Sequence, residues 1–253
     1  MQEIRQNLWV YEAAASGVSV RSVLILGERF AAVWDSLAHP SDVAVLSAFL
    51  ADKPFHLIYS HADWDHCWGT GGFARTPAAV VAHAECRRRF DADVPETLSR
   101  MQLTEITRWE AVRLLPPNLT FTRTLTLDLG GISLELHHLP GHTPDCIVGW
   151  IPEWGVLLGG DTFETPLPVV NGAAPVDAWL SDLEAWAARD DLAQTIPSHG
   201  SYEGREALEQ TIIYLRSLIG DRRFDLPGTL DTFYAETHQK NLQVMDGELD
   251  SVK

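Results

Sequence analysis

Four side chains that can bind a metal ion lie within six residues, in the segment His61-Ala62-Asp63-Trp64-Asp65-His66. The short apolar run Phe55–Tyr59 just before this segment has the pattern of a buried strand. A loop at the end of such a strand can turn all four side chains toward one point. Imidazole and carboxylate groups together suit zinc, iron or manganese. Taken alone, the segment is also compatible with a polar loop whose aspartates cap a helix.

Three further metal-type residues each follow an expected strand and stand beside glycine or proline. They are His142 in His138-Leu139-Pro140-Gly141-His142-Thr143-Pro144, Asp161 in Gly159-Gly160-Asp161-Thr162, and His199 in Pro197-Ser198-His199-Gly200. Tight turns at strand ends present side chains beyond the edge of a sheet, where binding residues are concentrated. We therefore expect several strand ends to converge on one metal site.

Together these motifs resemble those of the metallo-β-lactamase-fold superfamily. That family shows an HxHxDH loop, a PGHT turn, a GD(T/S) strand end and a late SHG-type histidine, and this chain has a counterpart of each in that order. The glycine-rich continuation Cys67–Gly72 and the pair Asp35-Ser36 also match the family pattern. The resemblance covers roughly residues 8 to 200 of the chain.

The resemblance implies an α/β fold, a four-layer αβ/βα metallo-β-lactamase-like sandwich with a metal site at one edge and extra C-terminal helices. It implies two divalent metal ions, with zinc first among the candidates. By the family pattern, the first ion is held by His61, Asp63 and His142, the second by Asp65, His66 and His199, and Asp161 bridges them. Asp35 and His138 fall where this family often places groups that orient a ligand.

Asp63 departs from the family pattern, because most members carry histidine at that position. The resulting HxDxDH motif is similar to the HxExDH of the flavodiiron proteins. A third aspartate makes the site harder and more electron-rich, which favours iron or manganese over zinc more than usual. A second consequence stays open: aspartate is shorter than histidine, so the first ion could be weakly bound or missing.

The motifs favour a metal-dependent hydrolase that uses a metal-activated bridging hydroxide on an ester, thioester, lactone or phosphoester. Asp65 could orient that hydroxide while remaining a ligand. Tyr202, three residues after His199, is a candidate proton donor to the leaving group. The alternative for Tyr202 is a role in helix packing alone.

Two other functions remain open at this point. The first is a non-haem diiron oxidoreductase that reduces dioxygen or nitric oxide. It would need a separate electron donor, because the residues after His199 are too few for a flavodoxin-like domain. The second is a non-catalytic metal-binding protein on a retained scaffold. Every ligand-type position holds a residue able to bind metal, which argues against a site that has lost its function.

Composition and charge narrow the class of protein. The chain has 253 residues, and its 19 basic and 35 acidic side chains give a net charge of −16, a field that repels nucleic-acid phosphates and anionic lipid. We find no apolar run long enough for a membrane span and no secretory signal pattern. Three cysteines without a paired motif favour a reducing, cytoplasmic environment. We expect a small-molecule substrate, no nucleic-acid or membrane partner, and a homodimer as an open option.

Apolar patterns predict the elements that must position these residues. Strands are expected at Leu8–Glu12, Val18–Glu28, Phe30–Trp34, Phe55–Tyr59, Ala78–Ala82, Thr120–Leu129, Ile132–His138, Cys146–Ile151, Gly155–Leu158 and Gln194–Pro197. Helices are expected at Val43–Ala51, Ala84–Phe90, Pro95–Leu115, Val176–Ala188, Gly204–Ile219 and Thr229–Val244.

We expect residues 1–200 to form the metallo-β-lactamase-like core, with a helical insert at about 95–115, and residues 201–253 to form a helical extension of the same domain. Trp109 on the insert, with Trp64 and Trp68 beside the ligands, would give an aromatic wall for an apolar acyl or aromatic substrate. The alternative is that Trp109 only seals the insert onto the core.

Overall fold

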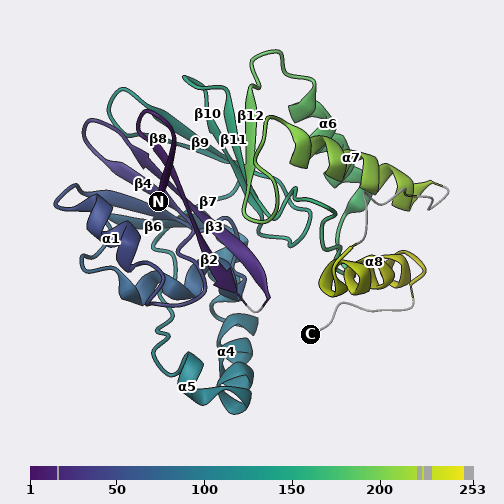
Figure 1. The fold of residues 1–253 in the computed structure, drawn as a ribbon, viewed down its shortest axis with the longest axis horizontal. Helices are drawn as coiled ribbons and strands as arrows, with labels where there is room; N and C mark the ends of the chain where they lie inside the picture. Colours follow the sequence, from purple (N-terminus) through teal and green to yellow (C-terminus); the bar gives the residue numbers. More distant parts are fainter. Residues whose placement is uncertain (16, 221–223, 225–229, 248–253) are drawn as a thin grey trace. The chain divides into compact units, whose positions relative to one another are not determined.

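The computed structural model describes residues 1–15, 17–220, 224 and 230–247 (Figure 1). The chain divides into two compact units, Met1–Leu136 and His137–Lys253, and each is described here by itself. The expected division into a core up to residue 200 and an extension from residue 201 stays a prediction.

The first unit is built on a seven-stranded sheet with its strands in sequence order. Its strands are β1 (Gln2–Arg5), β2 (Leu8–Ala15), β3 (Val18–Leu26), β4 (Ala31–Trp34), β5 (Phe55–Ile58), β6 (Ala79–His83) and β7 (Leu119–Phe121). The strands from β1 to β4 pair antiparallel, whereas β4, β5, β6 and β7 pair parallel. The expected strands are therefore present, and β1 is an additional strand that the sequence pattern did not predict.

Parallel pairing brings the carboxyl ends of β4 and β5 to the same edge of this sheet. The Asp35 amide, directly after β4, donates to the Ile58 carbonyl at 2.9 Å, which extends the pairing by one residue. Residues that follow each strand therefore lie beside one another although they are far apart in sequence. This places Asp35 next to the segment that begins at Ser60.

Short and medium-length helices lie between these strands in the chain. They are α1 (Ala44–Leu50), α2 (Trp64–Cys67), the 3-10 helix η1 (Trp68–Gly72), α3 (Ala84–Arg89), α4 (Asp93–Thr104) and α5 (Ile106–Trp109). The segment Ser60–Gly72, for which no helix was predicted, thus contains two short helices. Gly69 is required there, because a Cβ atom at that position would lie 1.9 Å from the Ser36 carbonyl oxygen.

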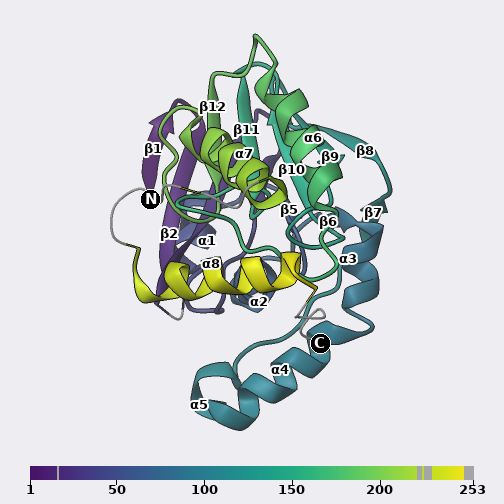
Figure 2. The same ribbon diagram turned by 90° about the vertical axis from the view of Figure 1, so that its right-hand side faces the viewer.

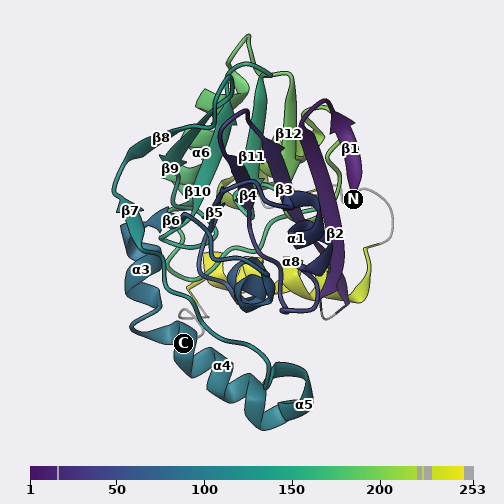
Figure 3. The same ribbon diagram turned by 90° about the vertical axis from the view of Figure 1, so that its left-hand side faces the viewer.

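The insert differs from the single helical stretch expected at Pro95–Leu115. Its helix α4 stops at Glu105, where φ is −138° and ψ is 62°, and α5 ends after one turn at Trp109. The Gln102 side chain donates to the Trp109 carbonyl at 3.1 Å and closes this bend. In each view α4 and α5 extend away from the sheet β1–β7 (Figures 1, 2 and 3).

The expected strand Thr120–Leu129 is split at Thr122 and Arg123 into β7 and β8 (Thr124–Asp128). The reason is that the chain changes sheets at this point, since β7 is the last strand of the first sheet. A five-stranded sheet has the order β12-β11-β10-β9-β8, with β9 (Ser133–His138) leading into the second unit.

The second unit contains β10 (Ile147–Ile151), β11 (Val156–Gly160), β12 (Gln194–Pro197), α6 (Val176–Ala187), α7 (Glu206–Ile219) and α8 (Thr232–Met245). The strands β10 and β11 form an antiparallel hairpin, whereas β11 and β12 pair parallel. The beginning of the expected helix Thr229–Val244 lies outside the described residues. Each unit has its own apolar core, and that of the second unit includes Trp179 and Phe163. Within the described ranges, no helix combines the length and apolar character that crossing a bilayer requires.

Candidate metal centre

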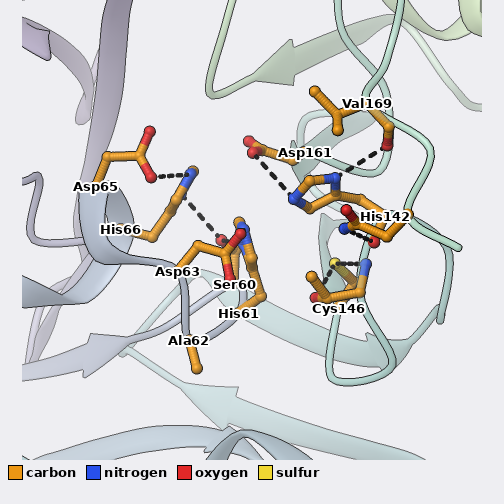
Figure 4. A network of polar contacts seen from close by, with 12 residues as sticks. Ser60, His61, Ala62, Asp63, Asp65, His66, His142, Cys146, Asp161 and Val169 are labelled. Carbon is orange, nitrogen blue, oxygen red and sulfur yellow. Dashed lines mark hydrogen bonds and ion pairs between the residues drawn. The ribbon is translucent and has the colours of Figure 1, made fainter. Parts of the chain in front are cut away.

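The first unit presents four ligand-type side chains directly after β5. The His61 Nε2 and Asp63 Oδ2 atoms lie 3.6 Å apart, and the His66 Nε2 and Asp65 Oδ1 atoms also lie 3.6 Å apart (Figure 4). Two atoms that bind the same tetrahedral cation, each at about 2.1 Å, lie about 3.4 Å from one another. Each pair therefore has the spacing of two ligands of one ion.

Hydrogen bonds on the other ring nitrogens fix the tautomers of these histidines. The Asp35 carboxylate lies 2.9 Å from His66 Nδ1 and accepts both the Ser60 amide and the Ser60 hydroxyl at 2.7 Å. Since that hydroxyl donates its proton to Asp35, it accepts from His61 Nδ1 at 3.0 Å. Both rings thus carry a proton on Nδ1 and a lone pair on Nε2, the atom that faces the aspartate. Asp35 thus contacts and orients the His66 ring, which agrees with the place expected for it, while the role of His66 as a ligand stays a prediction.

Asp63 occupies the N-cap position of α2 but makes no side-chain cap hydrogen bond. The alternative in which Asp63 serves as a helix cap is therefore wrong. Its Oδ1 atom is instead 2.7 Å from Nη2 of Arg89, the last residue of α3.

In the second unit, Asp161 and His199 are brought together by the parallel pairing of β11 and β12. The Ser198 amide donates to the Gly160 carbonyl at 2.9 Å, so the residues that follow the two strands are neighbours. Asp161 Oδ1 lies 3.5 Å from His199 Nε2, and Asp161 Oδ2 lies 3.8 Å from His142 Nε2. Because each carboxylate oxygen faces a different histidine, Asp161 has the geometry of a carboxylate shared by two cations.

His142 is presented by the turn after β9. Its Nδ1 donates to the Val169 carbonyl at 3.0 Å, which leaves the lone pair on Nε2, toward Asp161 (Figure 4). Gly141 is required in this turn because a Cβ atom there would lie 2.5 Å from the Trp179 ring. His138 lies 2.9 Å from the Pro144 carbonyl through Nε2. It therefore braces the turn that presents His142, and its expected role in orienting a ligand stays a prediction.

The segment that orients His142 is held in turn by α8. The Asn241 side chain accepts from the Val170 amide at 2.9 Å and donates to the Pro168 carbonyl at 2.7 Å. Asn241 is 1% exposed, so these bonds are made away from water. The Val169 carbonyl between the two bonded residues is thereby fixed in place for His142.

Replacing Asn241 by leucine should lower the free energy of unfolding by about 2–4 kcal/mol, because two buried backbone groups lose their partners. Urea denaturation measures this loss. Gln239→Leu, on an exposed position of the same helix, is the matched control and should change stability by less than about 0.5 kcal/mol. Equal stabilities of the two variants would show that Asn241 does not hold the segment.

Glu164 is a site residue that the sequence reasoning missed. Its carboxylate and ligand atoms of Asp161 and His199 all lie within 4.8 Å of one another, and Glu164 is 3% exposed. The Glu164 amide donates to the Thr211 hydroxyl, which donates back to the Glu164 carbonyl, both at 3.1 Å. These bonds to α7 fix where the carboxylate points. The only feature of the sequence that could have indicated Glu164 is its position three residues after Asp161.

Tyr234 on α8 is a neutral group close to these charges. Burial, and then the negative charges of Glu164 and Asp161, raise the pKa of Tyr234 far above its usual range. This shift favours the protonated, uncharged form of the Tyr234 hydroxyl.

Tyr202 is half-buried and lies in the loop between β12 and α7, where its carbonyl accepts from Gln194 at 3.0 Å. Tyr202 is therefore not part of a helix, and both its role as a proton donor and the alternative of packing alone stay predictions. Cys67 and Cys146 are buried and bind loop groups beside the ligands: Cys67 Sγ donates to the Asp63 carbonyl at 3.3 Å. Burial raises the pKa of Cys146, which keeps it a thiol.

The family model described as "Metallo-beta-lactamase superfamily" matches residues 15–209 of this chain. The chain belongs to the metallo-beta-lactamase superfamily. It is 36% identical over 101 residues to "Metallo-beta-lactamase type 2" of Bacteroides fragilis, a match that covers 38% of this chain and 40% of that protein. It is 26% identical over 224 residues to "Hydroxyacylglutathione hydrolase" of Anaeromyxobacter dehalogenans, covering 75% of this chain and 76% of the relative.

Solved structures agree on the fold of this metallo-beta-lactamase superfamily member. A metallo-beta-lactamase family protein from Thermus thermophilus superposes with a TM-score of 0.69 at 19% identity, covering 87% of this chain and 82% of that one. A metallo-beta-lactamase from Pontibacter korlensis gives 0.68 at 19% identity, covering 85% and 97%. The predicted α/β fold class is thus confirmed. The superfamily includes hydrolases, and the His and Asp groups of this chain could bind metal.

Proposed function

We propose that this protein is a metal-dependent hydrolase acting on an ester, thioester, lactone or phosphoester. The observation that carries the proposal is Asp161, whose two oxygens lie 3.5 and 3.8 Å from the Nε2 atoms of two different histidines. A carboxylate with one oxygen available for each cation suits a hydrolase that uses two metal ions. Family membership and the relative named as a hydrolase support the same reaction class.

The metal ligands we propose are the motif residues predicted from the sequence. His61, Asp63 and His142 would hold one divalent ion, Asp65, His66 and His199 a second, and Asp161 would be shared. The paired spacings within each unit and the Nδ1 hydrogen bonds support this assignment. Zinc is the ion we propose first, because imidazole and carboxylate ligands suit it. When bound, the ions would lower the pKa of a coordinated water and polarise the substrate oxygen.

The chain's own residues supply orientation and proton transfer. Asp35, Ser60 and the Val169 carbonyl hold three imidazoles with Nε2 presented, so no reorientation is needed when a ligand binds. We propose that Asp65 orients the attacking group through its second oxygen. The leaving group needs a proton, and Tyr202 and Glu164 are the two candidates. Comparing Tyr202→Phe with Glu164→Gln in leaving-group series of rising pKa distinguishes them.

The runner-up function is redox chemistry at a diiron site. Its support was the extra negative charge of Asp63, and the guanidinium of Arg89 at 2.7 Å offsets that charge. We therefore favour hydrolysis. We further propose that the substrate is a small molecule and that neither nucleic acid nor a membrane is a partner. A homodimer remains an option, and the proposed location is the cytoplasm.

The test is metal analysis of protein purified without chelator, paired with a panel of ester, thioester, lactone and phosphodiester substrates. We expect two zinc ions per chain and hydrolysis that a chelator abolishes and added zinc restores. Two iron ions with a visible absorption band that dithionite bleaches would instead support the oxidoreductase. Bound metal with no hydrolysis of any substrate class would support the non-catalytic alternative. Protein that binds no metal at all would overturn the proposal.

A further inference from the structure

Arg89 stands beside the one residue that breaks the family motif. Its Nη2 atom lies 2.7 Å from Asp63 Oδ1, while the other oxygen of Asp63, Oδ2, lies 3.6 Å from His61 Nε2. The two oxygens of the Asp63 carboxylate therefore face different partners. One oxygen is bound by a guanidinium, and the other is at ligand spacing from the neighbouring histidine.

Arg89 is itself fixed on its other side. Its Nε and Nη2 atoms lie 3.1 and 2.8 Å from Asp93 Oδ2, at the first residue of α4. A planar guanidinium held by two nitrogens has a defined orientation, which a flexible ammonium would lack. The side chains of Arg89 and Asp63 are 22% and 27% exposed, so the pair is largely shielded from water. The start of the insert thus sets the position of Arg89.

We infer that Arg89 is a positioning residue that lets Asp63 act in place of the histidine of the HxHxDH motif; this inference rests on the proposed function. Arg89 occupies one carboxylate oxygen, so Asp63 offers a single ligand atom, as an imidazole does. The positive charge of Arg89 is shared between Asp63 and Asp93, so the three side chains together carry one negative charge. Arg89 therefore reduces the negative charge that Asp63 adds to the site, which lessens the preference for iron or manganese over zinc.

The geometry also addresses the short reach of aspartate. An unanchored carboxylate at this position could rotate or bind with both oxygens. Contact with Arg89 restricts the Asp63 side chain to the rotamer that directs Oδ2 toward His61. Arg89 therefore influences how tightly one of the two proposed ions is bound.

The experiment measures metal content and affinity, by mass spectrometry and chelator competition, in wild type, Arg89→Gln, Arg89→Lys and Asp63→His/Arg89→Gln. Arg89→Gln should weaken one of the two zinc ions about 10–100-fold and raise the bound iron-to-zinc ratio in mixed-metal medium. Arg89→Lys keeps the positive charge but lacks the planar guanidinium, and it should give an intermediate loss of zinc affinity. The double variant restores the family motif and should regain wild-type zinc affinity.

The matched control is Arg88→Gln, because the Arg88 side chain is 72% exposed and pairs with Glu85 on the same helix. It should leave both affinities unchanged. Arg89→Gln with two zinc ions bound as tightly as in wild type would overturn the inference and leave the proposed function intact. Wild type without metal would overturn both. If Arg89→Gln melts at a lower temperature, rescue by the double variant separates a metal effect from a folding defect, and absence of rescue counts against the inference.

Discussion

Asp161→Asn should lower kcat/KM about 1000-fold and reduce the metal content to one ion or fewer per chain. The amide keeps one oxygen, but the nitrogen that replaces the other cannot bind a cation, and the negative charge between the two ions is lost. Asp161 is the residue whose two oxygens face His142 and His199 separately, so this single change acts directly on both proposed ions. Steady-state kinetics and metal analysis of the same preparation measure the two effects together.

Asp177→Asn is the matched control, because Asp177 is an exposed carboxylate in the first turn of α6. It should retain wild-type kinetics and metal. An Asp161→Asn protein that kept two ions and normal turnover would contradict the shared-carboxylate geometry.

Trp109→Ala should lower the free energy of unfolding by about 3–5 kcal/mol. Trp109 is 1% exposed and packs edge-on against Trp64 and Trp68, with ring centroids 5.6 and 5.5 Å away. The three tryptophans expected to lie together do so, and the burial of Trp109 in the core favours the sealing role over a pocket wall. Urea denaturation measures the loss of stability.

Ile106→Ala provides the control on the same short helix, because Ile106 is 62% exposed and should contribute less than about 0.5 kcal/mol. Substrates of increasing apolar chain length give the second readout for Trp109→Ala. Activity that falls uniformly and follows stability agrees with the sealing role. A loss that grows with chain length in a protein of normal stability would instead assign Trp109 to the substrate pocket.

Sequence reasoning reached the proposed ligands because each is marked locally. His142, Asp161 and His199 follow short strands and stand beside glycine or proline, and the strands were found nearly at their bounds, with Gln194–Pro197 identical. Parallel pairing, which brings Asp35 to His66, follows from the same strand pattern. These features depend on a few neighbouring residues, which is the range over which a single sequence is informative.

The missed features depend on contacts between distant residues. Arg89 is one of three consecutive arginines, and nothing local shows which of them reaches Asp63. Asn241 lies more than 70 residues from the Val170 amide that it binds. The helix α2 was missed because it spans only Trp64–Cys67, too short for a periodic pattern. Glu105, which ends α4, has no glycine or proline to mark the break.

Asn241, which binds the Val170 amide and the Pro168 carbonyl, lies beyond the family match, which ends at residue 209. A protein trimmed to that match would contain every predicted ligand and would pass a check of its motifs. It would still lack the amide that holds the Val169 carbonyl, so the His142 ring could turn and exchange its tautomer. Transplanting or shortening this fold on the basis of its motifs alone would therefore keep the predicted metal-binding residues but leave the His142 ring wrongly oriented.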